Sequence, residues 1–245
     1  MVEVLSTAIA ATRSLVAYVS VSLWVLVLGP PGMLLAVLFD WPEVLYLLGR
    51  GGVRLALASV GITYHAIGQE HIQLNRAAVY CVNHSSNIEP PILYMVLSVL
   101  HPRLKILYKA EIHKLPVLSR AFDIVGFVPI ERQNRNESMR AIDSAAASLR
   151  AGNSFLIFPE GTRSRTGELQ RFKKGGFIMA IKGQATIVPM AIQGTRMAMR
   201  KGSPIIRPVS VTVRLGLPVE VSGMGVDHRN GLIERTEMAV QALLD

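Results

Sequence analysis

The distribution of apolar and polar residues divides the chain into two parts. No charged side chain occurs in the 26 residues from Ser14 to Phe39. A second apolar segment, Glu43 to Ser59, carries three charged residues at spacings of seven and four, which places them on one stripe of a helix. Beyond it, short β-rich runs alternate with helical ones. The pattern predicts N-terminal membrane-associating helices over residues 1–59 and a folded domain over residues 60–245.

The long apolar segment is interrupted in its middle by Gly29-Pro30-Pro31-Gly32. A helix over Ser14 to Leu28 alone extends for about 22 Å, less than the hydrocarbon thickness of about 30 Å. Proline removes a backbone donor and glycine lowers helical propensity, so we expect two short helices that meet at this turn and dip into one leaflet. A single spanning helix and a cleaved signal peptide are the alternatives, although the second lacks a basic leading segment.

The rest of the chain predicts an α/β fold, with a mixed sheet flanked by helices on both faces and an N-terminal apolar helical membrane anchor. Its site would lie where loops leave the strand ends. Helical periodicity is found over 92–100, 139–149 and 226–244. The expected strands are Ile62–Ile67, Ala77–Val82, Leu104–Tyr108, Gly126–Ile130, Ser154–Phe158, Thr186–Ile192 and Val209–Val221, the last with a break near 216–218.

Composition sharpens this picture. Half of the residues are apolar and the net charge is +9, yet the first 76 residues are neutral, so all the excess positive charge lies in the predicted domain. This distribution suits a basic domain that faces anionic lipid head groups, phosphorylated substrates or nucleic acid. The single cysteine, Cys81, excludes an intramolecular disulfide and CxxC-type zinc or redox sites, and we expect it in the core.

The first segment with candidate chemistry is Asn83-His84-Ser85-Ser86-Asn87-Ile88-Glu89-Pro90, directly after a predicted strand. On a regular helix His84 and Glu89 would lie about 140° apart, so they can meet only across a strand-to-helix turn. A histidine held by a carboxylate in one tautomer is typical of a general base. The alternative is a polar turn that caps a helix.

The second segment is Phe158-Pro159-Glu160-Gly161-Thr162-Arg163-Ser164-Arg165, again after a predicted strand. Glycine permits close backbone approach, and the guanidinium of Arg163 matches phosphate oxygens. A solvated basic loop is the alternative. Two further strand ends carry Lys109 and Arg132.

The ordered segments NHSSNIE (83–89), GFVPIER (126–132), FPEGTRS (158–164) and IVPMAI (187–192) closely resemble the four blocks of the glycerolipid acyltransferase family. Among its members they are most similar to 1-acyl-sn-glycerol-3-phosphate acyltransferases of the PlsC type. The resemblance extends from about Gly61 to Val221. The family's first block normally ends in aspartate, whereas this chain has Glu89, whose extra methylene still allows it to reach His84.

The resemblance implies that His84 removes the proton of a lysophospholipid hydroxyl while Glu89 orients the ring, after which the alkoxide attacks an acyl thioester. It assigns the glycerol-phosphate part to Arg132, Glu160, Gly161, Thr162 and Arg163, with Lys109 as a further phosphate ligand. Val188 and Pro189 of the fourth block would shape the donor site. No metal or cofactor is implied, and Ser85 and Ser86 lack the GxSxG context of a nucleophile.

By this resemblance the acceptor is lysophosphatidate, the co-substrate is acyl-CoA or acyl carrier protein, and the product is phosphatidic acid. The expected location is the cytosolic side of the cytoplasmic membrane, with membrane lipids as partners. Another lysophospholipid or an ornithine-type lysolipid as acceptor is one alternative, and a catalytically inactive membrane-binding homologue is another. Nucleic acid is not expected as a partner, because no recognised binding module accompanies the basic residues.

Overall fold

The computed structural model describes residues 2–131, 135–200 and 202–245, and its centre is one mixed sheet of seven strands in the order β1-β7-β6-β2-β5-β3-β4. β6, β2, β5, β3 and β4 are parallel to one another, whereas β7 runs antiparallel to β6 and β1 is parallel to β7. All seven predicted strands are present. Their bounds are Thr63–Ile67 (β1), Ala78–Val82 (β2), Leu104–Lys109 (β3), Val128–Ile130 (β4), Ser154–Ile157 (β5), Thr186–Gln193 (β6) and Ser210–Leu215 (β7).

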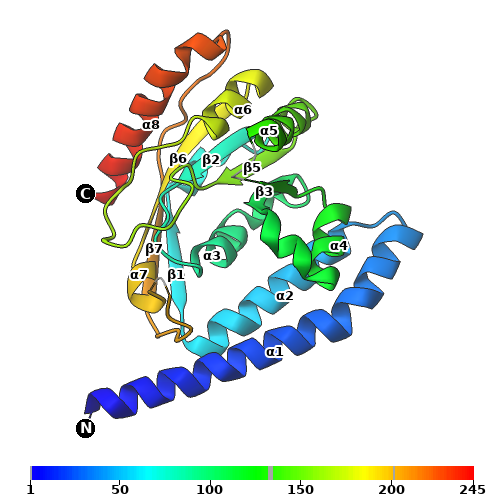
Figure 1. Cartoon of the computed structure of the whole chain (residues 1–245), viewed down its shortest axis with the longest axis vertical. Coiled ribbons are helices and arrows are strands. Elements are labelled where there is room, and N and C mark those ends of the chain that lie inside the picture. Colours follow the sequence, from blue (N-terminus) through cyan, green and yellow to red (C-terminus); the bar gives the residue numbers. More distant parts are fainter. Residues whose placement is uncertain (1, 132–134, 201) are drawn as a thin grey trace.

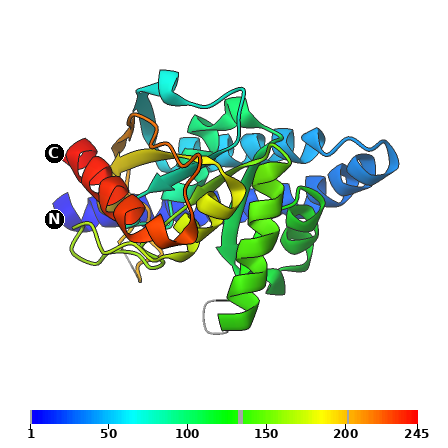
Figure 2. The ribbon, with the colours of Figure 1, turned by 90° about the horizontal axis from the view of Figure 1, so that it is seen from above.

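Helices cover both faces of the sheet, as the sequence predicts (Figures 1 and 2). The α-helices are Val2–Leu38 (α1), Glu43–Val60 (α2), Glu89–Val96 (α3), Pro116–Ile124 (α4), Arg135–Arg150 (α5), Gly175–Gly183 (α6), Thr195–Ala198 (α7) and Arg229–Leu244 (α8). Short 3-10 helices occupy Gln69–His71, Ser98–Leu100, Ala110–Lys114 and Val226–His228. The periodicity did not predict α4, α6 and α7, which are too short for a clear 3.6-residue repeat.

The strand β2 is buried on both sides and divides the hydrophobic core in two. Tyr80 and Val82 face a cluster that includes residues of α2 and α3, whereas Val79 and Cys81 face a second cluster with residues of α5, α6 and α8. This alternation follows from the two-residue period of a strand. Cys81 is fully buried, as expected, and burial raises the pKa of its thiol well above the usual range.

The predicted break in the N-terminal segment is wrong. The helix α1 continues through Pro30 and Pro31 and ends at Leu38, and the chain reverses only at residues 39–42, before α2 (Figure 1). Figure 1 shows α1 changing direction in its C-terminal part, a bend that the two prolines explain because each removes a helical hydrogen bond.

Tertiary packing accounts for the continuous helix. A Cβ atom at Gly29 would lie 3.0 Å from Val117 Cγ1 of α4, and one at Gly32 would clash with Leu48 of α2. These glycines therefore permit close contact between helices rather than a turn, and the contacts offset their low helical propensity. In the same way a Cβ at Gly51 of α2 would lie 2.5 Å from Trp24 Cζ2 of α1.

The helix α1 lies along the domain instead of projecting from it. Ser14 Oγ accepts a hydrogen bond from the Ile206 N–H at 2.8 Å, Tyr18 donates to the Pro204 carbonyl at 2.8 Å, and Ala17 packs into the core. The segment Glu3–Leu38 is nevertheless long and apolar enough to cross a membrane. Its outward face carries large exposed apolar side chains, among them Leu5, Leu15, Val19, Leu23, Leu26, Val27, Leu34 and Leu38.

Candidate active site

The expected site lies along one edge of the sheet, where the five mutually parallel strands reach their carboxyl ends. The loop after β2 carries His84, the loop after β5 carries Glu160 to Arg163, and β3 ends at Lys109. β6 leads into Thr195 on the same edge. Parallel pairing brings these loops together from distant parts of the chain, and this is the edge at which open α/β sheets bind ligands.

His84 and Glu89 form a close pair across the strand-to-helix turn. His84 Nδ1 lies 2.6 Å from Glu89 Oε2, and the carboxylate of Glu89 is fully buried. The helix α3 begins at Glu89, directly before Pro90, so the turn returns the carboxylate toward the imidazole as expected. Because an ionised carboxylate only accepts hydrogen bonds, Nδ1 carries the proton, and Nε2 is the ring nitrogen that can take one.

The loop after β5 holds the His84 loop in place through hydrogen bonds to both the N–H and the carbonyl of His84. The His84 N–H donates to Glu160 Oε1 at 2.6 Å, and the Ser164 N–H donates to the His84 carbonyl at 2.7 Å. The ring of His84 also stacks on Phe158, with 4.1 Å between the ring centroids. Backbone and ring are thus fixed by one segment, which leaves the imidazole little rotational freedom.

Glu160 is itself buried, and both of its carboxylate oxygens have internal donors. Oε1 accepts the His84 N–H, while Oε2 accepts the backbone N–H of Gln170 at 3.2 Å and its side-chain amide at 3.0 Å. Burial raises the pKa of Glu160 to about 7, against the lowering effect of these three bonds. Its bonds connect two loops of the site rather than extending into solvent.

The other predicted binding residues that the structure describes lie at the same edge and differ in exposure. Gly161 has a φ of +69°, and a Cβ there would lie 2.9 Å from the side chain of Lys173. Thr162 is exposed and Arg163 is partly exposed. Lys109 is exposed at the end of β3 and forms a 2.7 Å ion pair with Glu111. Arg132 lies outside the described residues.

Sequence reasoning missed several residues that shape this site. Thr195 Oγ1 donates to Glu89 Oε1 at 2.6 Å, and Ser85 contributes both its N–H and its hydroxyl to the same carboxylate. Asn83 pairs with the backbone of Ile192, accepting at 2.8 Å and donating at 3.0 Å, and so ties the end of β2 to β6. No local signal identifies Thr195, because the contact joins residues 106 positions apart.

The two serines beside His84 face away from it. Ser85 Oγ donates to Glu89 at 2.8 Å, and Ser86 Oγ donates to the Met199 carbonyl at 2.8 Å. Neither hydroxyl is directed at the imidazole, so the arrangement lacks the hydrogen bond of a serine nucleophile to its base. Among the residues that the structure describes, no three His, Cys, Asp or Glu side chains cluster in a way that could hold a metal ion.

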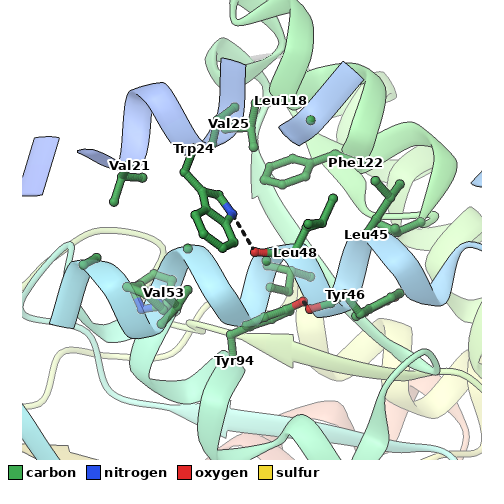
Figure 3. Close-up of a pocket in the computed structure, with 18 of the residues that line it drawn as sticks. Val21, Trp24, Val25, Leu45, Tyr46, Leu48, Val53, Tyr94, Leu118 and Phe122 are labelled. Atoms are coloured by element: carbon green, nitrogen blue, oxygen red, sulfur yellow. Dashed lines mark hydrogen bonds between the residues drawn. The ribbon is translucent and has the colours of Figure 1, made fainter. Parts of the chain in front are cut away.

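An apolar cavity of about 430 Å³ lies beside the start of α3 and is lined by residues of α1, α2, α3 and α4 (Figure 3). Trp24 of α1 forms one wall and donates its indole N–H to the Leu48 carbonyl at 3.0 Å. Tyr94 of α3 forms the opposite wall, and Pro90 and Pro91, which directly follow Glu89, also line the cavity. Its shape and lining suit a hydrocarbon chain.

Val188 and Pro189, expected near the donor site, lie within β6 opposite Tyr80 and Cys81 of β2. Both are buried. They are part of the scaffold beneath the site.

Comparison with known proteins connects this geometry to a family. Residues 63–193 match the model of the family described as Acyltransferase. A 1-acyl-sn-glycerol-3-phosphate acyltransferase of Limnanthes douglasii is 32% identical over 203 residues, which cover 80% of this chain and 70% of that protein. The corresponding protein of Limnanthes alba is 31% identical over the same shares of both chains.

The fold also matches a solved structure. The crystal structure of the 1-acyl-sn-glycerophosphate acyltransferase PlsC from Thermotoga maritima superposes with a TM-score of 0.77 over 96% of this chain and 99% of that one, at 20% sequence identity. The four motifs occur in the order of the family, and the loops that carry His84 and Glu160 meet at one edge of the sheet. Together with the family match and these relatives, this shows that the chain belongs to the acyltransferase family.

Proposed function

We propose that this protein transfers an acyl chain from an acyl thioester to the free hydroxyl of 1-acyl-sn-glycerol-3-phosphate, giving phosphatidic acid. The observation that carries the proposal is the His84–Glu89 pair at 2.6 Å, held at the carboxyl edge of the sheet in a member of the acyltransferase family. The relatives named as 1-acyl-sn-glycerol-3-phosphate acyltransferases support this acceptor.

The chemistry follows from the assigned tautomer. His84 Nε2 accepts the hydroxyl proton as the hydroxyl oxygen attacks the thioester carbonyl, and Glu89 stabilises the imidazolium through the Nδ1–H bond. Collapse of the tetrahedral intermediate breaks the carbon–sulfur bond, and the proton on Nε2 passes to the departing thiolate. The thioester is already activated, so both substrates react in one ternary complex without an acyl-enzyme.

We infer that Arg163 and Arg132 bind the acceptor phosphate, with Thr162 and the Gly161 backbone beside them and Lys109 as a further cation. A guanidinium offers paired donors to phosphate oxygens. For Glu160 the internal bonds to His84 and Gln170 support a positioning role, because both of its oxygens already have donors inside the protein.

The N-terminal helices are proposed to attach the domain to one leaflet. The long apolar helix α1 suggests membrane association, and its contacts with the domain from Ser14 onward support a helix lying along the surface rather than crossing. The basic domain would then face the anionic cytoplasmic leaflet. The cavity between α1, α2 and α3 would accommodate an acyl chain of a substrate.

The acceptor assignment is tested with purified protein, liposomes, a labelled long-chain acyl-CoA or acyl carrier protein, and a panel of lysolipids. We expect phosphatidate from lysophosphatidate at the highest kcat/KM. A higher kcat/KM with another lysophospholipid or an ornithine-type lysolipid would identify that lipid as the acceptor instead. Absence of transfer to every acceptor from both donors would indicate a catalytically inactive homologue.

Topology is tested with single cysteines at Thr7 and Glu43, on either side of the long apolar segment. Native Cys81 is fully buried, so the parent chain serves as the unlabelled control. An impermeant thiol reagent should label neither position in sealed cells and both after lysis. Labelling of one position alone in sealed cells would establish a spanning helix.

A further inference from the structure

The carboxylate of Glu89 sits in a closed set of donors from two distant segments. Oε2 faces His84 Nδ1. Oε1 accepts from the Ser85 N–H at 3.0 Å, the Ser85 hydroxyl at 2.8 Å, the Ser86 N–H at 3.0 Å and the Thr195 hydroxyl at 2.6 Å. All of these donors except the Thr195 hydroxyl belong to the His84 loop itself.

Thr195 is held rigidly enough to act as a fixed donor. It begins α7 directly after β6, and its side chain is 1% exposed. The preceding Gly194 has a φ of +92°, and a Cβ there would lie 2.7 Å from the Ser210 carbonyl oxygen of β7. The turn thus lies tightly against the neighbouring strand, which fixes the position of the Thr195 hydroxyl. That hydroxyl also lies 3.3 Å from Ser85 Oγ.

We propose that Thr195 is a positioning residue for acyl transfer, and that with Ser85 it forms a socket fitted to glutamate at position 89. This inference rests on the proposed function of His84. A glutamate has one more rotatable bond than an aspartate, and that freedom must be restricted for Oε2 to stay on the imidazole. The Thr195 hydroxyl restricts it by fixing Oε1, and it stabilises the carboxylate charge that faces the developing imidazolium.

The socket is fitted to the length of a glutamate side chain. Shortening Glu89 by one methylene withdraws the carboxylate by about 1.5 Å. The shorter group cannot remain on both His84 and Thr195, which contact different oxygens of it. An aspartate that stays on His84, as any remaining turnover requires, therefore leaves the buried Thr195 hydroxyl unsatisfied. Glu89→Asp should therefore lower activity here, although it restores the family's usual residue.

A double-mutant cycle of Thr195→Val and Glu89→Asp tests the proposal by steady-state kinetics and by the unfolding midpoint. Loss of a hydrogen bond to a charged group predicts a fall in kcat of about tenfold for Thr195→Val. KM for both substrates should stay within about twofold, since the socket contacts neither. In the Glu89→Asp background the same change should alter kcat less than about twofold, because the contact is already lost.

Two further variants separate positioning from structure. Thr195→Ser keeps the hydroxyl and should retain most of kcat. Thr186→Val is the matched control, because Thr186 is a buried threonine at the opposite end of β6 that also donates to a carboxylate, that of Glu220 at 3.0 Å, and it should leave kcat unchanged.

Multiplicative effects of the two substitutions, a rise in KM at constant kcat, or failure of Thr195→Ser to restore turnover would overturn the proposal. The unfolding midpoints decide independently of catalysis whether the two residues interact. Non-additive shifts support the socket, and additive shifts refute it. A wild-type protein that folds but transfers no acyl chain would contradict the proposed function instead.

Discussion

The N-terminal helices and the loops at the carboxyl edge of the sheet both contain glycine, proline and short polar residues, but the two regions use them differently. In α1 and α2, Gly29, Gly32 and Gly51 provide close contact between helices that continue uninterrupted. At the edge, Gly161 and Gly194 adopt positive φ angles in tight turns. Glycine therefore marks a turn at the edge, where its φ is positive, but not in α1 and α2, where its missing side chain makes room for a neighbouring helix.

Local sequence signals are sufficient where a contact forms within one turn of the chain. The His84–Glu89 contact at the edge forms within one strand-to-helix turn, whereas the glycine contacts of α1 and α2 join residues of different helices. Substitutions of the reacting groups at the edge should therefore act mainly on turnover, and substitutions between the helices should act mainly on stability.

The largest effect is expected from His84→Ala. Removal of the general base should lower kcat by at least about 100-fold, while the fold and membrane association remain because only a loop side chain is lost. The measurement is phosphatidate formation on liposomes together with circular dichroism and vesicle flotation. Turnover near that of the wild type would exclude His84 as the base.

Arg163→Ala should raise the acceptor KM by about tenfold and change the donor KM much less, because a phosphate contact affects one substrate selectively. Arg76→Ala is the control, since Arg76 lies before β2 at the opposite edge and pairs with Glu220 at 2.6 Å. Equal changes in both KM values would assign Arg163 a structural role.

Gly51→Ala tests the other region. The added Cβ would lie 2.5 Å from Trp24 Cζ2, so overpacking should destabilise the fold by about 1–3 kcal/mol. The control is Gly231→Ala in α8, where the added Cβ would have no atom within 4 Å. This substitution should stabilise the fold by about 0.5–1 kcal/mol. Unfolding in detergent followed by circular dichroism compares the two. A stabilised Gly51→Ala would show that α1 and α2 are not closely packed.

The smallest effect concerns pH. His101 packs against the rings of Tyr46 and Tyr94, and burial, with the nearby Arg50 charge, lowers its pKa to about 4. As the pH falls, His101 is protonated in the unfolded state before it is protonated in the folded state. Its contribution to the free energy of unfolding is therefore present above about pH 6.5 and is lost as the pH drops toward 4. Between pH 6.5 and 5.5 the wild type should lose about 1 kcal/mol more than His101→Gln. Equal losses in both proteins would refute this buried neutral state.

Much of the sheet could be predicted from the sequence because buried parallel strands form short apolar runs with clear boundaries, as in β2 and β5. The contact of His84 with Glu89 was predictable because the turn, Pro90 and the spacing act locally. The bond from Gln170 was not, because it depends on how the long loop after β5 folds back on Glu160, and the bond from Thr195 was not, because it joins segments 106 positions apart. The continuity of α1 through Pro30 and Pro31 was missed for the same reason.

In the proposed mechanism His84 activates the acceptor directly, so that transfer takes place in one complex of both substrates. Incubation of the protein with a labelled acyl thioester, with and without lysophosphatidate, tests it most directly. We expect label in phosphatidate only when the acceptor is present, no label on the denatured protein, and intersecting lines in two-substrate initial-rate plots. Labelled protein formed without acceptor, together with parallel lines, would contradict the account and indicate an acyl-enzyme.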